Sequence, residues 1–516
     1  MNSIRTYGRC IKFIFFAIVI VCLLFLITTT NLITPLLDEE QQHGPTFEMQ
    51  DVLPRNVGEK QLAESYRSTA IGTYNRSDVV RALSSLYQHS KNVSSDHAHS
   101  VFVQMMNFSN LMKTMEVKTV LLEPAILYSM LSENQQKLLQ KRKFDAKNYL
   151  GSKNILTFMI QEEDVQKLRK EEHLKTMSTA GYKVLFVNDT LPFWMWQNSP
   201  DKKDFPSAVF HMFFQRQEWT IHVVIFYKRK KYFWHAAFNN PGVKDVPSMD
   251  DLLFARRDGA YDKFAFLEVN FNGTTNQSVN IPSDLQYFLF QIPTSSFMEC
   301  NLSRAVNITK GPRNKPHDGL FSFEAFNERT LIALRELKVL LNPLLMHFWI
   351  WSGTMLGWYR QCDIIPYTTD VDFGAWADEV LNVEELKELF INNKNLKIKE
   401  SLGMIDRALE FHLETKRLRV DLFFLYQEKN GTWYGGHRST RKYYFKYHHP
   451  NFTLCSGELL GEKVLVPCES EKCIISEYGP EWTMPVSDWW FDWSIKNKGP
   501  NIYWEKSVQD KVHKLF

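Results

Sequence analysis

Strong net charge, internal repeats and long low-complexity tracts are all missing from this 516-residue sequence. Lysine and arginine total 61 against 58 aspartates and glutamates, which leaves a formal charge of +3. A balance so close to neutral does not indicate a nucleic-acid-binding protein, and we expect no nucleic acid among its partners. The length is sufficient for two or three domains.

Cysteine is scarce, and five of the seven cysteines follow the first 33 residues: Cys300, Cys362, Cys455, Cys468 and Cys473. Because five is odd, at least one thiol is free or pairs between molecules, and the sequence alone does not give the pairing. The Cys468-x4-Cys473 spacing has no second Cys or His pair at zinc-site distance, so no structural zinc site is assigned.

Charge is absent from one long apolar run near the N-terminus. Residues 13–33 approach the roughly 20 apolar residues that a helix needs to cross a bilayer. Basic residues precede this run and acidic residues follow it: Arg5, Arg9 and Lys12, then Asp38, Glu39 and Glu40. The positive-inside rule therefore predicts a cytosolic tail at 1–12 and an uncleaved signal anchor at 13–33. A cleaved signal peptide is the alternative, but the run is long for one and no small-x-small site closes it cleanly.

Ten Asn-x-Ser/Thr sequons support a lumenal location for the rest of the chain: Asn75, Asn92, Asn107, Asn188, Asn272, Asn276, Asn301, Asn307, Asn430 and Asn451. The sequence thus predicts a membrane-anchored, single-pass type II glycoprotein.

The lumenal part divides into three regions. Residues 34–100 are polar and weakly periodic, so we expect them to form a stem. We expect residues 101–315 to form a smaller α/β N-terminal domain. In that domain we expect a strand and helix at Thr119–Leu131, a hairpin at Trp219–Tyr227 and Tyr232–Phe238, and a strand at Asp284–Ile292. No catalytic group of residues is evident there.

Residues 316–516 predict a nucleotidyltransferase-like α/β (α+β) catalytic domain with a mixed sheet. The expected order is helix Phe321–Asn342, strand Leu345–Ile350, the small-residue turn Ser352-Gly353-Thr354, helix Asp378–Asn392, and a hairpin of Leu409–Leu413 with Leu418–Tyr426. This hairpin would carry Asp421 beside the strand at Asp370–Phe373.

Three carboxylates carry the expected chemistry. Asp370 and Asp372 alternate with apolar Val371 and Phe373, as on one face of a strand, and Asp421 lies within an apolar strand. An ionised side chain in such surroundings is costly unless it is paired or binds metal. The three predict a site for Mg²⁺ or Mn²⁺ that would neutralise a nucleotide pyrophosphate during phosphoryl transfer.

Simpler readings stay open for each of these residues. Asp370 and Asp372 would then lie in a solvated turn, and Asp421 would pair with Arg419 or Lys416. Ser352, Gly353 and Thr354 are expected to bind the phosphates of the donor. Arg360 either contacts phosphate or pairs with Asp363 or Asp370.

The run Trp351–Gly374 resembles the fukutin family, as do the segments His448–Cys455, Val466–Glu469 and Glu477–Gly479. More broadly, Ser-Gly-Thr…Asp-x-Asp is similar to LicD-type phosphocholine transferases. Those carry extra acidic residues before Asp-x-Asp, where this chain has Thr368 and Thr369.

The resemblance implies a Golgi enzyme that transfers ribitol 5-phosphate from CDP-ribitol to the terminal N-acetylgalactosamine of the phosphorylated O-mannosyl glycan on α-dystroglycan, releasing CMP. It also implies as partners fukutin-related protein and other Golgi enzymes of O-mannose glycan synthesis. Two alternatives remain: a LicD-like transferase of another CDP-linked donor such as phosphocholine, and a non-catalytic Golgi scaffold.

Overall fold

The computed structural model describes residues 73–88, 95–150, 154–197, 207–238, 246–248, 251–271, 274–308, 322–438, 442–486 and 494–516. All of these belong to one compact unit, Tyr66–Phe516. The predicted tail (1–12) and anchor (13–33) lie outside the described residues. Within the described ranges, no helix has both the length and the apolar composition needed to span a membrane.

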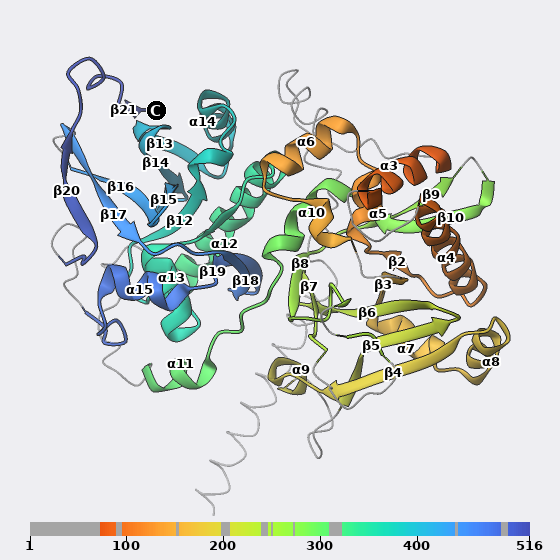
Figure 1. Ribbon diagram of the computed structural model, residues 1–516. Helices are drawn as coiled ribbons and strands as arrows, with labels where there is room; N and C mark the ends of the chain where they lie inside the picture. The colour runs from red at the N-terminus through yellow and green to blue at the C-terminus, as the bar shows by residue number, and fades with distance from the viewer. Residues whose placement is uncertain are drawn as a thin grey trace, which may run out of the picture. The chain divides into compact units, whose positions relative to one another are not determined.

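The N-terminal domain is a mixed ten-stranded sheet with helices packed around it (Figure 1). The order is β1-β9-β10-β2-β3-β6-β5-β4, and β7 joins β6 to β8. The strands are β1 (Thr73–Tyr74), β2 (Val120–Leu121), β3 (Ile155–Gln161), β4 (Lys183–Thr190), β5 (Ser207–Arg216), β6 (Trp219–Arg229), β7 (Tyr232–His235), β8 (Gly259–Asp262), β9 (Phe266–Phe271) and β10 (Thr274–Pro282). The predicted hairpin is confirmed as β6–β7, and the predicted strand and helix at 119–131 as β2 and α5.

The helices of this domain begin well before residue 101. They are α3 (Arg76–Gln88), α4 (Ser95–Thr114), α5 (Pro124–Ser129), α6 (Glu133–Lys141), α7 (Glu162–Leu168), α8 (Glu171–Thr179), α9 (Phe193–Gln197), α10 (Leu285–Gln291) and α11 (Leu302–Ile308), with 3₁₀ turns η1 (Ala146–Tyr149) and η3 (Ile292–Thr294). Val79, Leu83 and Tyr87 of α3 are buried in the domain core. The predicted stem at 34–100 is therefore wrong for its last part, because Thr73 and Tyr74 pair with β9 of the sheet and apolar side chains of 76–88 and 95–100 are buried in the domain core. The expectation of a smaller N-terminal domain is also wrong, because β1, α3 and the start of α4 extend this domain before residue 101 and its sheet has ten strands.

The strand predicted at 284–292 is helix α10. Asp284 accepts a hydrogen bond from the Tyr287 N–H and so caps the helix, and Leu285, Phe288 and Leu289 are buried at helical spacing. A short, continuously apolar segment fits a strand and a buried helix equally well, and here the cap decides.

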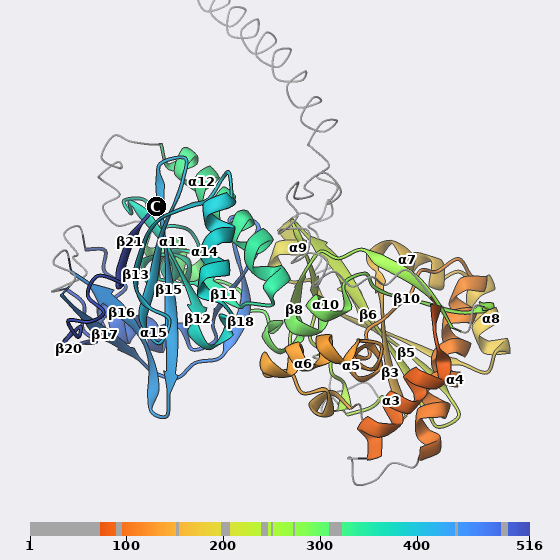
Figure 2. The same cartoon turned by 90° about the horizontal axis from the view of Figure 1, so that it is seen from above.

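The C-terminal domain contains a nine-stranded mixed sheet and a two-stranded ribbon, β18–β19 (Figure 2). Its strands are β11 (Phe348–Ile350), β12 (Asp370–Trp376), β13 (Lys397–Met404), β14 (Arg407–Thr415), β15 (Leu418–Glu428), β16 (Gly431–His437), β17 (Tyr443–His449), β18 (Leu454–Leu459), β19 (Glu462–Pro467), β20 (Lys498–Tyr503) and β21 (His513–Leu515). Its helices are α12 (Phe323–Leu341), α13 (Ser352–Gln361), α14 (Val383–Asn392) and α15 (Ser470–Tyr478), with turns η4 (Asn342–Leu344) and η5 (Ala377–Glu379). The helix predicted from Asp378 starts only at Val383, where Asn382 caps it.

The β14–β15 hairpin is formed as the sequence predicts. Lys416 and Arg417 both have positive φ, at 45° and 70°, as in the two-residue turns that match the twist of paired strands. This turn sets the register of the hairpin and places His412 directly opposite Asp421.

Two disulfides lie in the C-terminal half, one joining cysteines 62 residues apart and one joining cysteines 13 residues apart. Cys300 pairs with Cys362 and Cys455 with Cys468, while Cys473 is a buried free thiol. The prediction that at least one thiol is unpaired is confirmed for Cys473. Because Cys468 is in a disulfide, its spacing from Cys473 has no metal-binding meaning.

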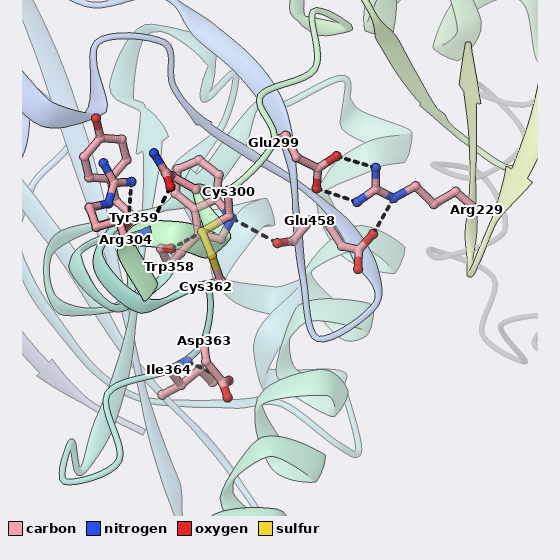
Figure 3. Close-up of a disulfide and its surroundings, with 11 residues drawn as sticks. Arg229, Glu299, Cys300, Arg304, Trp358, Tyr359, Cys362, Asp363, Ile364 and Glu458 are labelled. Atoms are coloured by element: carbon pink, nitrogen blue, oxygen red, sulfur yellow. Dashed lines mark hydrogen bonds and ion pairs between the residues drawn. A yellow bond between two sulfur atoms is a disulfide. The ribbon is translucent and has the colours of Figure 1, made fainter. Parts of the chain in front are cut away.

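Arg229 of β6 links the two domains electrostatically. Its guanidinium donates two hydrogen bonds to Glu299, at 2.6 and 2.7 Å, and one to Glu458, at 2.8 Å (Figure 3). The Arg229 side chain is 6% exposed, against 16% for Glu458 and 53% for Glu299. Truncation of Arg229 would therefore remove one of the two cationic partners of the largely buried Glu458 and leave Lys230, whose Nζ is also 2.8 Å away.

We expect Arg229→Ala to lower the free energy of unfolding by about 2–3 kcal/mol, less than for a fully buried pair because Glu299 is half exposed. Chemical denaturation monitored by circular dichroism measures this change. Lys231→Ala, at an exposed position two residues away, is the matched control and should leave stability unchanged. Equal stability of the two variants would contradict the structural role of Arg229.

Candidate active site

The predicted carboxylates lie on two adjacent parallel strands. Strands β12 and β15 are neighbours in the C-terminal sheet (Figure 1). Asp372 is the register partner of Asp421, and Asp370 is the partner of Arg419. Paired residues of neighbouring strands point to the same face of a sheet, and so do residues two apart in one strand. Asp370, Asp372 and Asp421 therefore share one face, as the sequence predicts.

The same face continues in register over four strands. Asp421 is opposite His412, and His412 is opposite Glu400. The His412 ring nitrogens are hydrogen-bonded to Glu400 and Glu410, both at 2.8 Å. Although burial opposes protonation, the Glu410 carboxylate and its hydrogen bond raise the pKa of His412 to about 9.

Arg419 balances part of the negative charge on this face. Its Nε donates to Asp421 Oδ1 at 2.8 Å, which matches the simpler reading that Asp421 pairs with Arg419. This pairing does not neutralise the site. Burial raises the pKa of Asp421 to about 6, and Arg419 offsets only part of that rise.

The segment predicted as a turn, Ser352-Gly353-Thr354, is instead the first turn of helix α13. The correction has a local cause: Trp351 is extended, Ser352 has a φ of +41°, and the helix starts directly after β11. The Gly353 N–H donates to Asp372 Oδ2 at 3.0 Å, and the Asp372 N–H donates to Thr354 Oγ1 at 2.8 Å. Helix α13 thus begins directly against the Asp372 carboxylate.

Arg360 lies nine residues into α13 and is buried. Its Nη2 donates a hydrogen bond of 3.2 Å to Gln361 Oε1, and among the described residues no carboxylate lies within ion-pair distance of its guanidinium. The alternative of pairing with Asp363 or Asp370 is therefore wrong. Contact with phosphate stays a prediction for Arg360, as it does for Ser352, Gly353 and Thr354.

A fourth carboxylate, Glu477 of α15, lies next to this site. Its Oε1 accepts a hydrogen bond of 2.5 Å from Ser352 Oγ, and the side chain is 0% exposed. Burial raises the pKa of Glu477 to about 7, and the hydrogen bonds from Ser352 and Tyr478 oppose that rise.

The carboxylates of this site affect the pKa of Asp372 most strongly. Burial, followed by the charges of Asp370, Asp421 and Glu477, raises the pKa of Asp372 well above its usual range. Crowded carboxylates with one arginine among them form a site in which a divalent cation would relieve repulsion.

The chemistry of the donor set fits Mg²⁺ or Mn²⁺ at Asp370, Asp372 and Asp421, since hard cations prefer carboxylate oxygens. Within the described residues, a tighter group exists at Glu410, His412 and Asp421, whose ligand atoms lie within 4.8 Å of one another. That group is already compensated by His412 and Arg419, and a protonated imidazole offers no lone pair to a metal. The more open aspartate set is therefore the better candidate.

Sequence reasoning did not assign roles to Glu410, His412 and Glu477. For the first two a signal was present, because Glu410 and His412 alternate with the buried Phe411 and Leu413 on the strand facing Asp421. Glu477 follows Cys473 and Ile474 at helical spacing, which predicts that Glu477 lies on the buried face of a helix. The spacing does not predict that Glu477 lies near Asp372.

Comparison with known proteins identifies both domains. Residues 346–469 match the family model described as the LicD/FKTN/FKRP nucleotidyltransferase domain, and residues 68–316 match the fukutin N-terminal model. The C-terminal fold and its carboxylate face therefore define a nucleotidyltransferase-domain protein of the LicD class. With the fukutin N-terminal domain before it, the chain belongs to the fukutin family.

Curated relatives agree with this assignment. The chain is 34% identical over 305 residues to "Ribitol-5-phosphate transferase FKTN" from Homo sapiens, and equally to the proteins of that name from Macaca fascicularis and Mus musculus. The matched region covers 58% of this chain and 63% of each relative.

Proposed function

We propose that this chain is a transferase that moves ribitol 5-phosphate from CDP-ribitol to a phosphorylated O-mannosyl glycan and releases CMP. The name of its relatives supports the transferred group. The single structural observation that carries the proposal is the β12–β15 register, which aligns Asp372 with Asp421 beside the start of α13.

Asp370, Asp372 and Asp421 would hold the cation, Mg²⁺ or Mn²⁺, which supplies neutralisation of the negative charge on the donor pyrophosphate. Thr368 donates a hydrogen bond of 3.1 Å to Asp370 Oδ1 and restricts that carboxylate. The Gly353 N–H orients Asp372 in the same way.

The chain's own groups would also act on the two substrates. The acceptor hydroxyl oxygen forms a bond to the phosphorus that carries ribitol, and the bond from that phosphorus to the CMP oxygen breaks. Asp421 either completes the cation site or accepts the proton of that hydroxyl. Thr354 Oγ1 accepts a hydrogen bond from the Asp372 N–H. The hydroxyl proton of Thr354 is therefore free to be donated to a phosphate oxygen of CDP-ribitol.

We further propose that the chain works in the Golgi lumen, anchored by residues 13–33 as a single-pass type II protein. The Cys300–Cys362 and Cys455–Cys468 disulfides support an oxidising compartment. The acceptor would be the terminal N-acetylgalactosamine of the glycan on an α-dystroglycan-like protein, with fukutin-related protein and other Golgi O-mannose enzymes as partners.

A donor comparison tests this function. Full-length protein in detergent is incubated with Mn²⁺, a phosphorylated O-mannosyl glycopeptide ending in N-acetylgalactosamine, and CDP-ribitol, CDP-glycerol or CDP-choline in turn. We expect CMP release from CDP-ribitol to be at least about 100-fold faster than from CDP-choline, because a site built for donor hydroxyls rejects analogues that lack them.

Release of CMP from CDP-choline alone would refute the ribitol assignment. Absence of release with all three donors would favour the scaffold alternative.

A further inference from the structure

Glu477 is a buried carboxyl group without a cationic neighbour. Among the described residues, no lysine or arginine lies within ion-pair distance of it. His449 Nε2 is 3.7 Å from Glu477 Oε2, but burial lowers the pKa of His449 to about 3. The two His449 ring nitrogens are instead hydrogen-bonded to Ser476 and Asn497. Burial of a carboxyl group without a cationic partner lowers the stability of the folded state. A contribution to folding stability therefore does not explain why a glutamate occupies this position.

The partner of Glu477 is a residue in an unfavourable backbone conformation. Ser352 has a φ of +41°, a region that side-chain-bearing residues seldom adopt. Its hydroxyl contacts Glu477 Oε1 at 2.5 Å and the Tyr478 hydroxyl at 3.1 Å. These contacts from the end of α15 hold Ser352 in place at the start of α13.

Beyond Ser352, the first turn of α13 fits closely around Asp372. The Gly353 N–H and Thr354 Oγ1 bond to the side chain and the backbone of Asp372. A Cβ on Gly353 would lie 3.1 Å from Asp372 Oδ2, so there is little space for this turn to shift. A displacement of Ser352 would therefore be passed on to the Asp372 carboxylate.

We propose that Glu477 is a positioning residue: through Ser352 it holds the first turn of α13 in place and so sets the orientation in which Asp372 meets a divalent cation. This role rests on the cation site of the proposed function, and it adds a residue that is 125 positions away from Ser352 in the chain. Glu477 itself contacts neither cation nor donor.

Mn²⁺ affinity is the direct readout, measured on the full-length protein from the electron paramagnetic resonance signal of free Mn²⁺. Ser352→Ala and Glu477→Leu should each weaken binding about 10–100-fold, the usual effect of removing a group that orients a metal ligand. Both substitutions remove the same hydrogen bond between Ser352 and Glu477. The double variant should therefore have the same Mn²⁺ affinity as the single variant that binds Mn²⁺ less tightly.

Two further variants complete the series. Glu477→Gln keeps an oxygen that can accept from Ser352 and should stay within about threefold of the parent, since the hydrogen bond is preserved. Glu471→Gln, at an exposed position on the same helix, is the matched control and should change nothing. If Glu477→Leu fails to fold by circular dichroism, Ser352→Ala and Glu477→Gln carry the test.

Parent-like Mn²⁺ affinity in Ser352→Ala, or losses that multiply in the double variant, would overturn the proposal. So would a parent protein that does not bind Mn²⁺. Failure of the proposed function can be distinguished from failure of this proposal. If the parent protein binds Mn²⁺ but does not release CMP, the Mn²⁺ affinities of the variants still test the positioning role of Glu477.

Discussion

Asp372→Asn is expected to reduce ribitol phosphate transfer by at least about 1000-fold while the protein stays folded. The substitution removes a cation ligand but keeps an oxygen that can accept the Gly353 hydrogen bond. It should also raise stability slightly at neutral pH. The pKa of Asp372 is raised in the folded state, so its ionised form opposes folding above its unfolded-state pKa, and asparagine removes that cost.

Activity and stability are therefore expected to change in opposite directions, which general damage to the fold would not produce. CMP release is measured with Mn²⁺, and thermal unfolding is measured on the same preparation without divalent cation. Asp510→Asn, at an exposed position in the same domain, is the control and should match the parent in both. Retention of parental turnover by Asp372→Asn would exclude the proposed cation site.

Chelation of divalent cations is the second large effect. With EDTA, transfer should fall by at least about 1000-fold, because Asp370, Asp372, Asp421 and the donor phosphates would then repel one another without compensation. Excess Mg²⁺ or Mn²⁺ should restore turnover. Undiminished CMP release after exhaustive chelation would exclude a divalent cation from the reaction.

A binding measurement complements that experiment. A ligand that binds only the folded state raises the midpoint of thermal unfolding, so Mn²⁺ should stabilise the parent in a concentration-dependent manner. Asp372→Asn should show much less of this stabilisation, since it lacks one ligand. An equal shift in both proteins would place the bound cation elsewhere.

Local patterns predicted the elements that carry the site. Alternation around Asp370 and Asp372 identified β12, and the apolar run around Asp421 identified β15. The sequence also predicted that β15 lies beside β12, in a hairpin with β14. Each of these strands has one polar face, and a shift of one residue in the pairing would turn that face into the core, so few registers are possible.

Prediction failed where local sequence is ambiguous. The segment at 284–292 is apolar throughout, and residues 73–88 have their apolar face interrupted by polar side chains. Ser352 has an unusual φ that no local pattern specifies, because contacts with Glu477 and Tyr478 of another helix hold it there.

Three aspartates at strand spacing and in apolar surroundings are sufficient to predict a cation site from the amino-acid sequence alone. Only the tertiary structure decided which further groups surround that site. Glu477, His412 and Arg419 come close to the aspartates through strand register and helix packing. Contacts between residues far apart in the chain depend on how whole elements pack, and short-range periodicity holds no information about that packing.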